Sequence, residues 1–178
     1  FQFYTGDVTR TYPISGKFSE DHKRVYQKVL DLQKQVIAQV KPGMQFAQLQ
    51  EKTISGLVDI MLDEGLLTGL KADIIESGSF KKYYPHGVSH WLGMDVHDAG
   101  MVELGGQSRS LEVGMCFTVE PGIYVPLNDQ EAPKALRGMG IRIEDNILVT
   151  EIGCENMTES AVKEVEALEG IIGTSTPV

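Results

Sequence analysis

Three of the four histidines in the chain fall within twelve positions, in the segment PHGVSHWLGMDVHD. His86 and His90 are four residues apart, so on a strand both side chains would point to the same face. His97 lies seven residues beyond His90, and a bulge at Gly93 could bring it to that face as well. Imidazoles gathered in this way indicate metal binding or proton transfer. The alternative is three histidines at the surface or at the edge of the core.

Carboxylates with unusual neighbours occur at three places outside this segment. Glu120 ends the apolar run MCFTV and precedes Pro-Gly. If its carboxylate is buried there, it needs a partner, which a metal ion would provide. The alternative is a glutamate at a strand end that is exposed to water. Glu144, in IRIEDNILV, shares a strand face with Arg142. That face either lines a polar site or is solvated, in which case the charge pair contributes little. Asp7, in TGDVTRTYP, is by itself typical of a turn aspartate that accepts a backbone hydrogen bond.

Together these residues form a candidate ligand set of Asp7, His90, Glu120 and Glu144. Hard oxygen donors with one imidazole suit a carboxylate-bridged pair of Mn, Co, Fe or Zn ions better than a structural zinc site. Two cations about 3.5–4 Å apart can activate water and polarise a scissile carbonyl, so hydrolysis of an amide is predicted. The sequence has no GxSxG elbow, HExxH helix, P-loop or Rossmann glycine pattern that would indicate another chemistry.

Two long helices are expected to support this site. Residues 1–18 alternate and are rich in aromatic and β-branched types, which predicts a strand. Ser19 is a good N-cap for a helix that Lys-Pro-Gly at 41–43 would stop. A second helix is predicted over 45–64, and a helical or turn segment over 66–78.

Beyond Phe80 the pattern changes to strands. Three β-type runs are predicted over 89–98, 115–125 and 140–150, followed by a short helix over 159–168 and a Ser/Thr/Pro tail. No repeat and no linker divides the chain. The predicted fold class is α+β, with helices beside an antiparallel sheet.

The bulk composition excludes several classes of protein. A length of 178 residues, 42% of them hydrophobic and 23% charged, is typical of one soluble globular domain. Sixteen basic against 25 acidic residues give a net charge of -9, which argues against a nucleic-acid partner. Two cysteines make no disulfide framework. No apolar run reaches the roughly 18–20 residues of a membrane span, and no signal peptide is evident, so a cytoplasmic location is expected.

Four motifs resemble those of the pita-bread metallopeptidases, namely GDVTRTYP, HGVSHWLGMDVHDAG, TVEPGIYV and GIRIEDNILVT. They are most similar to the bacterial Xaa-Pro aminopeptidase branch and come in the family order between residue 1 and about 168. The resemblance implies a pseudo-symmetric α+β fold. Its curved antiparallel sheet, with helices on the outer face, would cradle two divalent cations, usually manganese.

The resemblance also assigns the metal ligands. Asp7 would bridge the two cations, His90 and Glu120 would bind one of them, and Glu144 would bridge both. The family has a fifth ligand, an aspartate about eleven residues before the bridging one, and counting back from Asp7 falls before Phe1. Residues 1–178 are therefore expected to be a partial C-terminal catalytic domain, without the N-terminal domain and the start of the catalytic domain, and inactive alone.

Further roles follow from the same resemblance. His97 would contact substrate and help stabilise the tetrahedral intermediate, and His86 would help shape the pocket that accepts proline. His97, Glu120 and His86 are the predicted catalytic residues, with a carboxylate assisting proton transfer to the leaving proline nitrogen. Arg142 and Tyr124 would orient the carboxylates. The parent enzyme is expected to remove the first residue from peptides with proline second, and to be a homo-oligomer.

Several alternatives share the fold. An Xaa-Pro dipeptidase (prolidase) or a methionine aminopeptidase would differ in specificity. A pita-bread module that only binds proteins would have lost ligands, and a metal-free amidinohydrolase such as creatinase would work through histidine. Every ligand position covered by the chain carries the expected residue type, which favours a metallopeptidase, and Trp91 directly after His90 favours the aminopeptidase branch.

Overall fold

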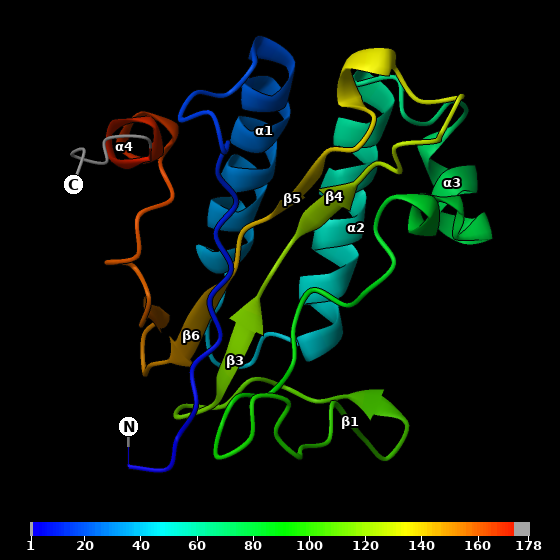
Figure 1. Ribbon diagram of the computed structural model, residues 1–178. Helices are drawn as coiled ribbons and strands as arrows, with labels where there is room; N and C mark the ends of the chain where they lie inside the picture. Colours follow the sequence, from blue (N-terminus) through cyan, green and yellow to red (C-terminus); the bar gives the residue numbers. More distant parts are fainter. Residues whose placement is uncertain (1, 173–178) are drawn as a thin grey trace.

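Two long helices, side by side, form one layer of the molecule in the computed structural model, which describes residues 2–172 (Figure 1). They are α1 (Glu20–Ile37) and α2 (Phe46–Asp63). The shorter helices are α3 (Lys71–Ser77), α4 (Val165–Ile171) and the 3-10 turns η1 (Ser79–Lys82) and η2 (Lys134–Leu136).

The first helix begins where the sequence predicts. The Ser19 side chain accepts a hydrogen bond from the His22 amide, and two acidic residues follow in the first turn. Its buried stripe includes Val25, Val29 and Val36. The helix ends at Ile37, a few residues before the predicted stop at 41–43, because the chain tightens there into a turn.

The second helix also confirms the prediction for 45–64. Gln45 and Gln48 form a reciprocal capping box at its start. Gly65, at φ +67°, adopts the left-handed conformation that lets the chain leave the helix end. Part of the predicted 66–78 segment is helical as α3.

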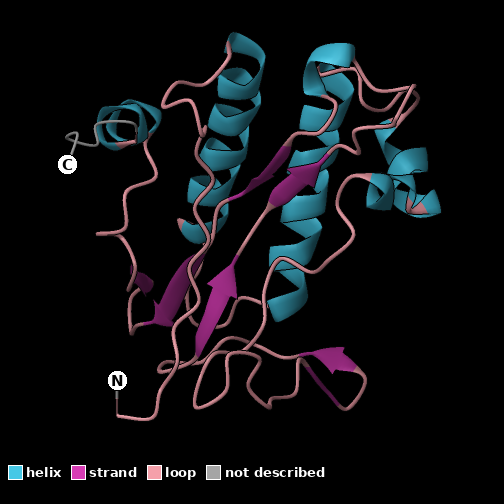
Figure 2. Cartoon of the chain, in the orientation of Figure 1, coloured by secondary structure: helices cyan, strands magenta, loops and turns pink. Residues whose placement is uncertain are grey.

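The strands are short, antiparallel where they pair, and lie in front of the two long helices (Figure 2). One sheet has the order β3-β6-β7, and a second consists of β4 and β5. A small hairpin, β1-β2, lies apart from them. Their bounds are β1 Glu103–Leu104, β2 Gln107–Ser108, β3 Cys116–Val119, β4 Gly122–Tyr124, β5 Gly140–Arg142, β6 Asp145–Val149 and β7 Cys154–Asn156.

The two long predicted strands are present, but each is interrupted once. The run 115–125 divides into β3 and β4 at Glu120-Pro121, and the run 140–150 divides into β5 and β6 at Ile143-Glu144. The interruptions face each other, with the Ile143 amide donating to the Pro121 carbonyl at 3.3 Å. Regular pairing therefore stops at the two candidate carboxylates, on both strands.

Two predicted strands are wrong, and the short last helix is present but shifted along the chain. Residues 2–18 form an extended segment without a strand ladder, in which the Thr11 hydroxyl contacts both the amide and the carbonyl of Arg142. Residues 89–98 make one bridge, Trp91 with Phe117, and then curl into a loop. The last helix, predicted over 159–168, begins at Val165, and the carbonyls at 161 and 162 accept hydrogen bonds from the Arg10 guanidinium instead of belonging to it. Residue 1 and the tail beyond 172 lie outside the described residues.

The apolar core lies between the helices and the sheets. Its largest fully buried side chains include Tyr26, Phe117 and Ile123. Cys116 and Cys154 are free and partly buried, as expected for structural thiols. Among residues 2–172 no helix combines the length and apolar character needed to cross a bilayer.

Glu64, at the end of α2, joins the two long helices. Its carboxylate accepts hydrogen bonds from Arg24 and Lys28 of α1, both at 2.8 Å. Burial of the Glu64 carboxyl favours a raised pKa, but the two cationic donors outweigh it and hold the pKa below its ordinary value. The folded state therefore gains stability from the ionised carboxylate above the unfolded pKa of about 4.3, and loses it as the pH falls through the folded pKa.

Glu64→Gln is expected to destabilise the chain by about 1 kcal/mol at neutral pH, a modest value because Arg24 and Lys28 are partly solvated. The loss should shrink as the pH falls below about 4.3, where the wild-type carboxyl is protonated too. Urea unfolding across this pH range measures it. Asp59→Asn, which breaks an exposed pair with Lys71, is the control and should have little effect. A loss from Glu64→Gln that is independent of pH would contradict the assignment.

Candidate metal centre

Side chains from four distant segments converge in front of the interrupted strands. His90 Nε2 lies 3.4 Å from Asp7 Oδ2 and 3.4 Å from Glu120 Oε1. Ligand atoms of His90, Glu120 and Glu144 all lie within 4.8 Å of one another, and the same holds for Asp7, His90 and His97. His90 belongs to both groups, so the two groups form one continuous cluster.

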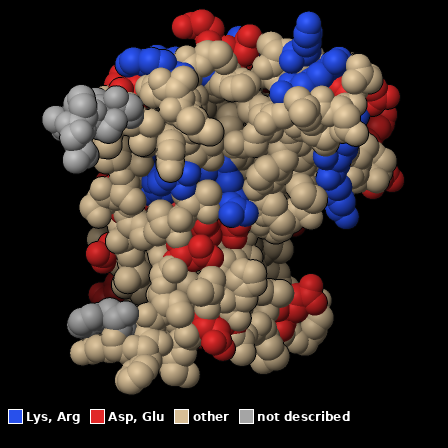
Figure 3. Space-filling model, in the orientation of Figure 1, with Lys and Arg blue, Asp and Glu red and all other residues tan. Residues whose placement is uncertain are grey.

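The fold explains this convergence. Glu120 follows β3 and Glu144 precedes β6. The extended N-terminal segment that carries Asp7 runs alongside them, where the Glu144 amide donates to the Thr9 carbonyl (Figure 1). His90 lies on the segment beside β3, where its carbonyl accepts from the Thr118 amide at 3.0 Å. In Figure 3, acidic side chains gather near the middle of the visible face, at the level where β3 ends, with basic side chains directly above them.

The His90 ring is oriented by the backbone of the next residue. Nδ1 lies 3.0 Å from the Trp91 carbonyl oxygen, which can only accept, so Nδ1 carries a proton. In the neutral imidazole, the lone pair on Nε2 then faces the carboxylates of Asp7 and Glu120. His90 Nε2 and the two carboxylates are all hydrogen-bond acceptors, so none of them can donate to another. A bound cation would give all three a shared partner. Thr118 also donates to Glu120 Oε1 at 3.1 Å, which fixes that carboxylate.

Thr9 links the Glu144 carboxylate to the N-terminal segment. Its hydroxyl donates to Glu144 Oε2 at 2.6 Å and accepts from Arg142 Nε at 3.2 Å. The Glu144 amide in turn donates to the Thr9 carbonyl at 3.1 Å. Arg142 therefore reaches the Glu144 carboxylate through Thr9.

Asn146 holds the backbone of Asp7. In the amide orientation that satisfies both of its polar atoms, the Asn146 nitrogen donates to the Asp7 carbonyl at 2.6 Å. The Asn146 oxygen accepts from the Asp7 amide at 3.2 Å. This two-point contact replaces the backbone pairing that a strand would provide, and it directs the Asp7 side chain toward His90.

Burial raises the pKa values of both Glu120 and Glu144 above the ordinary range. Among residues 2–172, the ion pairs of Glu120 are with imidazoles, His90 at 3.4 Å and His86 at 3.8 Å. Two buried carboxylates therefore lie close together, and the nearby Arg142 guanidinium offsets only part of their charge, since both pKa values stay raised. A divalent cation would offset this desolvation and repulsion, and the oxygen-rich donor set fits such an ion.

His86 and His97 lie on two sides of this cluster. His86 Nε2 is 2.7 Å from the Tyr124 hydroxyl, and its Nδ1 is 2.7 Å from the Gly87 carbonyl oxygen. Burial lowers the pKa of His86, which favours the neutral ring. The His97 ring lies 4.2 Å from the His90 ring, centroid to centroid, and is exposed. All the predicted site residues thus lie in or beside one cluster, and their catalytic and ligand roles remain predictions.

Three residues that support this site were not singled out from the sequence: Thr9, Asn146, and Arg10, whose guanidinium donates to the Glu144 carbonyl. Thr9 lies two residues after Asp7, the spacing that puts side chains on one face of an extended segment. Asn146 is a buried polar residue that, with Asp145, precedes the apolar part of β6. Such a residue needs a hydrogen-bond partner, and this was the available signal.

The chain belongs to metallopeptidase family M24, which its residues 1–151 match. It is 41% identical to the Xaa-Pro aminopeptidase of Haemophilus influenzae over 172 residues, which cover 97% of this chain and 40% of that protein. The Escherichia coli Xaa-Pro aminopeptidase is 40% identical over 174 residues, covering 97% and 38%. The chain therefore spans about two fifths of the length of these two curated relatives.

Solved structures support the same family. The Pseudomonas aeruginosa aminopeptidase PepP matches with a TM-score of 0.93 and 38% identity, over 97% of this chain and 39% of that one. Escherichia coli aminopeptidase P with the inhibitor Pro-Leu matches with a TM-score of 0.90 and 38% identity, over 97% and 39%. The predicted α+β pita-bread fold is confirmed.

In the loop that carries His97, the backbone of Gly100 packs closely against the Trp91 ring. A methyl group at Gly100 would overlap the ring of Trp91, the single tryptophan of the chain. Gly100→Ala is therefore expected to displace the loop, change the Trp91 fluorescence and destabilise the chain by about 1–3 kcal/mol. Fluorescence spectra and urea unfolding measure both effects. Gly170→Ala, where a methyl group meets open space, is the control; equal spectra for all three proteins would refute the predicted displacement.

Proposed function

We propose that this chain is the metal-binding part of an aminopeptidase that removes the first residue from peptides with proline in second position. The proposal is carried by the convergence of His90 with Asp7, Glu120 and Glu144 in a chain that belongs to family M24. Its similarity to Xaa-Pro aminopeptidases over nearly its whole length supports the specificity. Because those relatives are longer, the activity is proposed for the whole protein that contains residues 1–178, as a partial catalytic domain.

Two divalent cations are proposed as cofactors, most simply manganese. Asp7, His90, Glu120 and Glu144 would hold them, since carboxylates can bridge two ions and their oxygens suit hard cations. When bound, the cations supply activation of water and polarisation of the scissile carbonyl. Zinc is a proposed alternative, because one neighbouring structure is a zinc-substituted aminopeptidase P in complex with product.

The protein side chains would bind and orient the substrate. His97, exposed beside His90, is placed to donate to the carbonyl oxygen that precedes proline. Glu120, whose pKa is raised by burial, is suited to exchange a proton with the leaving nitrogen. His86 would form part of the proline pocket, with its ring fixed by Tyr124. Arg142 would orient Glu144 through Thr9.

Metal binding tests the site directly. The wild-type chain is expected to bind Mn(II) by titration calorimetry and to give a Co(II) absorption spectrum. Glu144→Gln should weaken binding more than about tenfold, since losing a ligand should cost at least as much as losing a ligand's hydrogen-bond partner. Glu151→Gln removes an exposed carboxylate away from the cluster and is the matched control. No binding by the wild type, or equal affinity in all three proteins, would refute the proposed metal centre.

Specificity is tested in the longest natural protein that contains this chain. Release of the first residue from a tripeptide with proline second should exceed cleavage of the corresponding dipeptide, whereas a prolidase would show the reverse. His97→Ala should lower kcat/KM about a hundredfold or more while leaving Mn(II) affinity within about threefold. A large loss of Mn(II) affinity would instead identify His97 as a ligand, which its distance from Asp7 and His90 permits.

Two further properties are proposed. The whole protein is proposed to form a homo-oligomer, on the resemblance to its family, and to act in the cytoplasm, on the sequence pattern alone. Fractionation of cells and sedimentation of the purified whole protein test these two points separately.

A further inference from the structure

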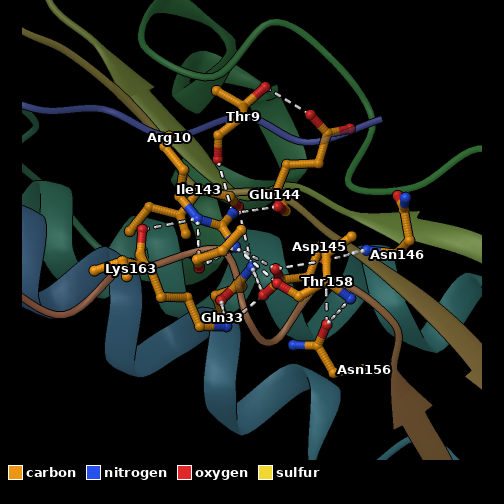
Figure 4. A network of polar contacts seen from close by, with 12 residues as sticks. Thr9, Arg10, Gln33, Ile143, Glu144, Asp145, Asn146, Asn156, Thr158 and Lys163 are labelled. Carbon is orange, nitrogen blue, oxygen red and sulfur yellow. Dashed lines mark hydrogen bonds and ion pairs between the residues drawn. The ribbon is translucent and has the colours of Figure 1, made fainter. Parts of the chain in front are cut away.

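A buried polar network lies directly behind the candidate metal centre (Figure 4). At its centre is Asp145, the residue after Glu144, which is fully buried. Its carboxylate accepts from Arg10 at 2.7 Å, from Thr158 at 2.8 Å and from Gln33 at 3.0 Å, and it also contacts the Lys163 ammonium group. Arg10, Gln33, Asp145 and Lys163 are called the brace below.

The brace and the metal cluster use opposite faces of the same stretch of chain. Successive side chains along extended backbone point to opposite faces. Glu144 accordingly contacts Thr9 on the side of Asp7, whereas Asp145 contacts Gln33 of α1 on the other side. The brace is therefore placed to fix the backbone of Glu144 without touching its carboxylate.

Arg10 hydrogen-bonds to the backbone of two segments that carry candidate ligands, the N-terminal segment with Asp7 and the segment with Glu144. Besides its ion pair with Asp145, one of its terminal nitrogens donates to the carbonyl oxygens of Glu144 and of Thr9. Another donates to the Ala161 carbonyl at 2.8 Å. A planar guanidinium can make these contacts at once because its donors point in fixed, divergent directions.

Gln33 acts on the interrupted strands from behind. Its side-chain nitrogen lies 3.4 Å from the Val119 carbonyl oxygen and 3.3 Å from that of Ile143. These are the residues immediately before Glu120 and Glu144, where regular pairing stops. Within residues 2–172, in contrast, the hydrogen bonds of the Lys163 ammonium group are with side chains of the brace, namely Gln33 and Asp145.

We propose that Arg10 is a positioning residue, which locks the Asp7–Thr9 segment onto the backbone of Glu144 so that the two carboxylates face one cation. The inference rests on the proposed metal centre, and it adds a requirement that the ligands alone do not imply. Arg10 touches no candidate ligand side chain. Its effect is expected in metal affinity and coordination geometry.

The test compares two variants that each remove one cation beside Asp145. Arg10→Met removes the contacts to the backbone at Thr9 and Glu144, whereas Lys163→Met removes contacts within the brace alone. Arg10→Met should weaken Mn(II) binding by about ten- to a hundredfold and alter the Co(II) spectrum. Lys163→Met should change the affinity by less than about threefold. Circular dichroism first establishes the temperature range in which each variant is folded.

A third variant covers the case in which Arg10→Met does not fold. Arg10→Lys keeps the charge beside Asp145, but one ammonium group cannot reach all the acceptors of the guanidinium, so reduced Mn(II) affinity and an altered Co(II) spectrum are still expected. Wild-type affinity and spectrum in every folded Arg10 variant would overturn the inference. Equal losses in the Arg10 and Lys163 variants would also overturn it, because general loosening of the brace would then explain both. Failure of the wild type to bind any cation would count against the proposed function instead.

Discussion

The structure depends on one interruption of backbone pairing. Two antiparallel strand pairs, β3 with β6 and β4 with β5, would form one continuous ribbon if pairing did not stop at Glu120-Pro121 and Ile143-Glu144. Pro121 has no amide hydrogen to donate to the neighbouring strand, so its covalent structure alone explains part of the interruption. The gap places two carboxylates on facing strands within reach of one imidazole.

An interruption of this kind leaves backbone groups that require partners, and side chains supply them. The Gln33 amide reaches the carbonyls of Val119 and Ile143, and the Arg10 guanidinium binds that of Glu144. On the opposite side the hydroxyl of Thr11 and the amide of Asn146 hold the N-terminal segment where a strand would otherwise pair. The site is thus surrounded by hydrogen bonds from side chains, which can set angles that a regular ladder does not allow.

This arrangement is electrostatically costly without a bound cation. Glu120 and Glu144 are buried close together, and burial disfavours their ionised forms. By contrast, the equally buried Asp145 has cationic partners from two segments, and the hydrogen bonds of Lys163 and Arg10 overcome burial and keep its pKa low. The adjacent residues Glu144 and Asp145 are therefore treated differently by the protein. The Asp145 carboxylate is held ionised by its cationic partners, whereas the Glu144 carboxylate keeps a raised pKa and is available to a ligand.

The sequence by itself determined the two long helices, the strand runs 115–125 and 140–150, and the residue types of the candidate site. These follow from local patterns: the spacing of apolar residues, the Ser19 cap, and carboxylates at the ends of apolar runs. Only the tertiary structure decided how residues 2–18 and 89–98 are held, where the last helix begins, and that Thr9, Arg10 and Asn146 support the site. Their partners are more than a hundred residues away, and such hydrogen bonds override local strand and helix preferences without leaving any periodic trace in the sequence.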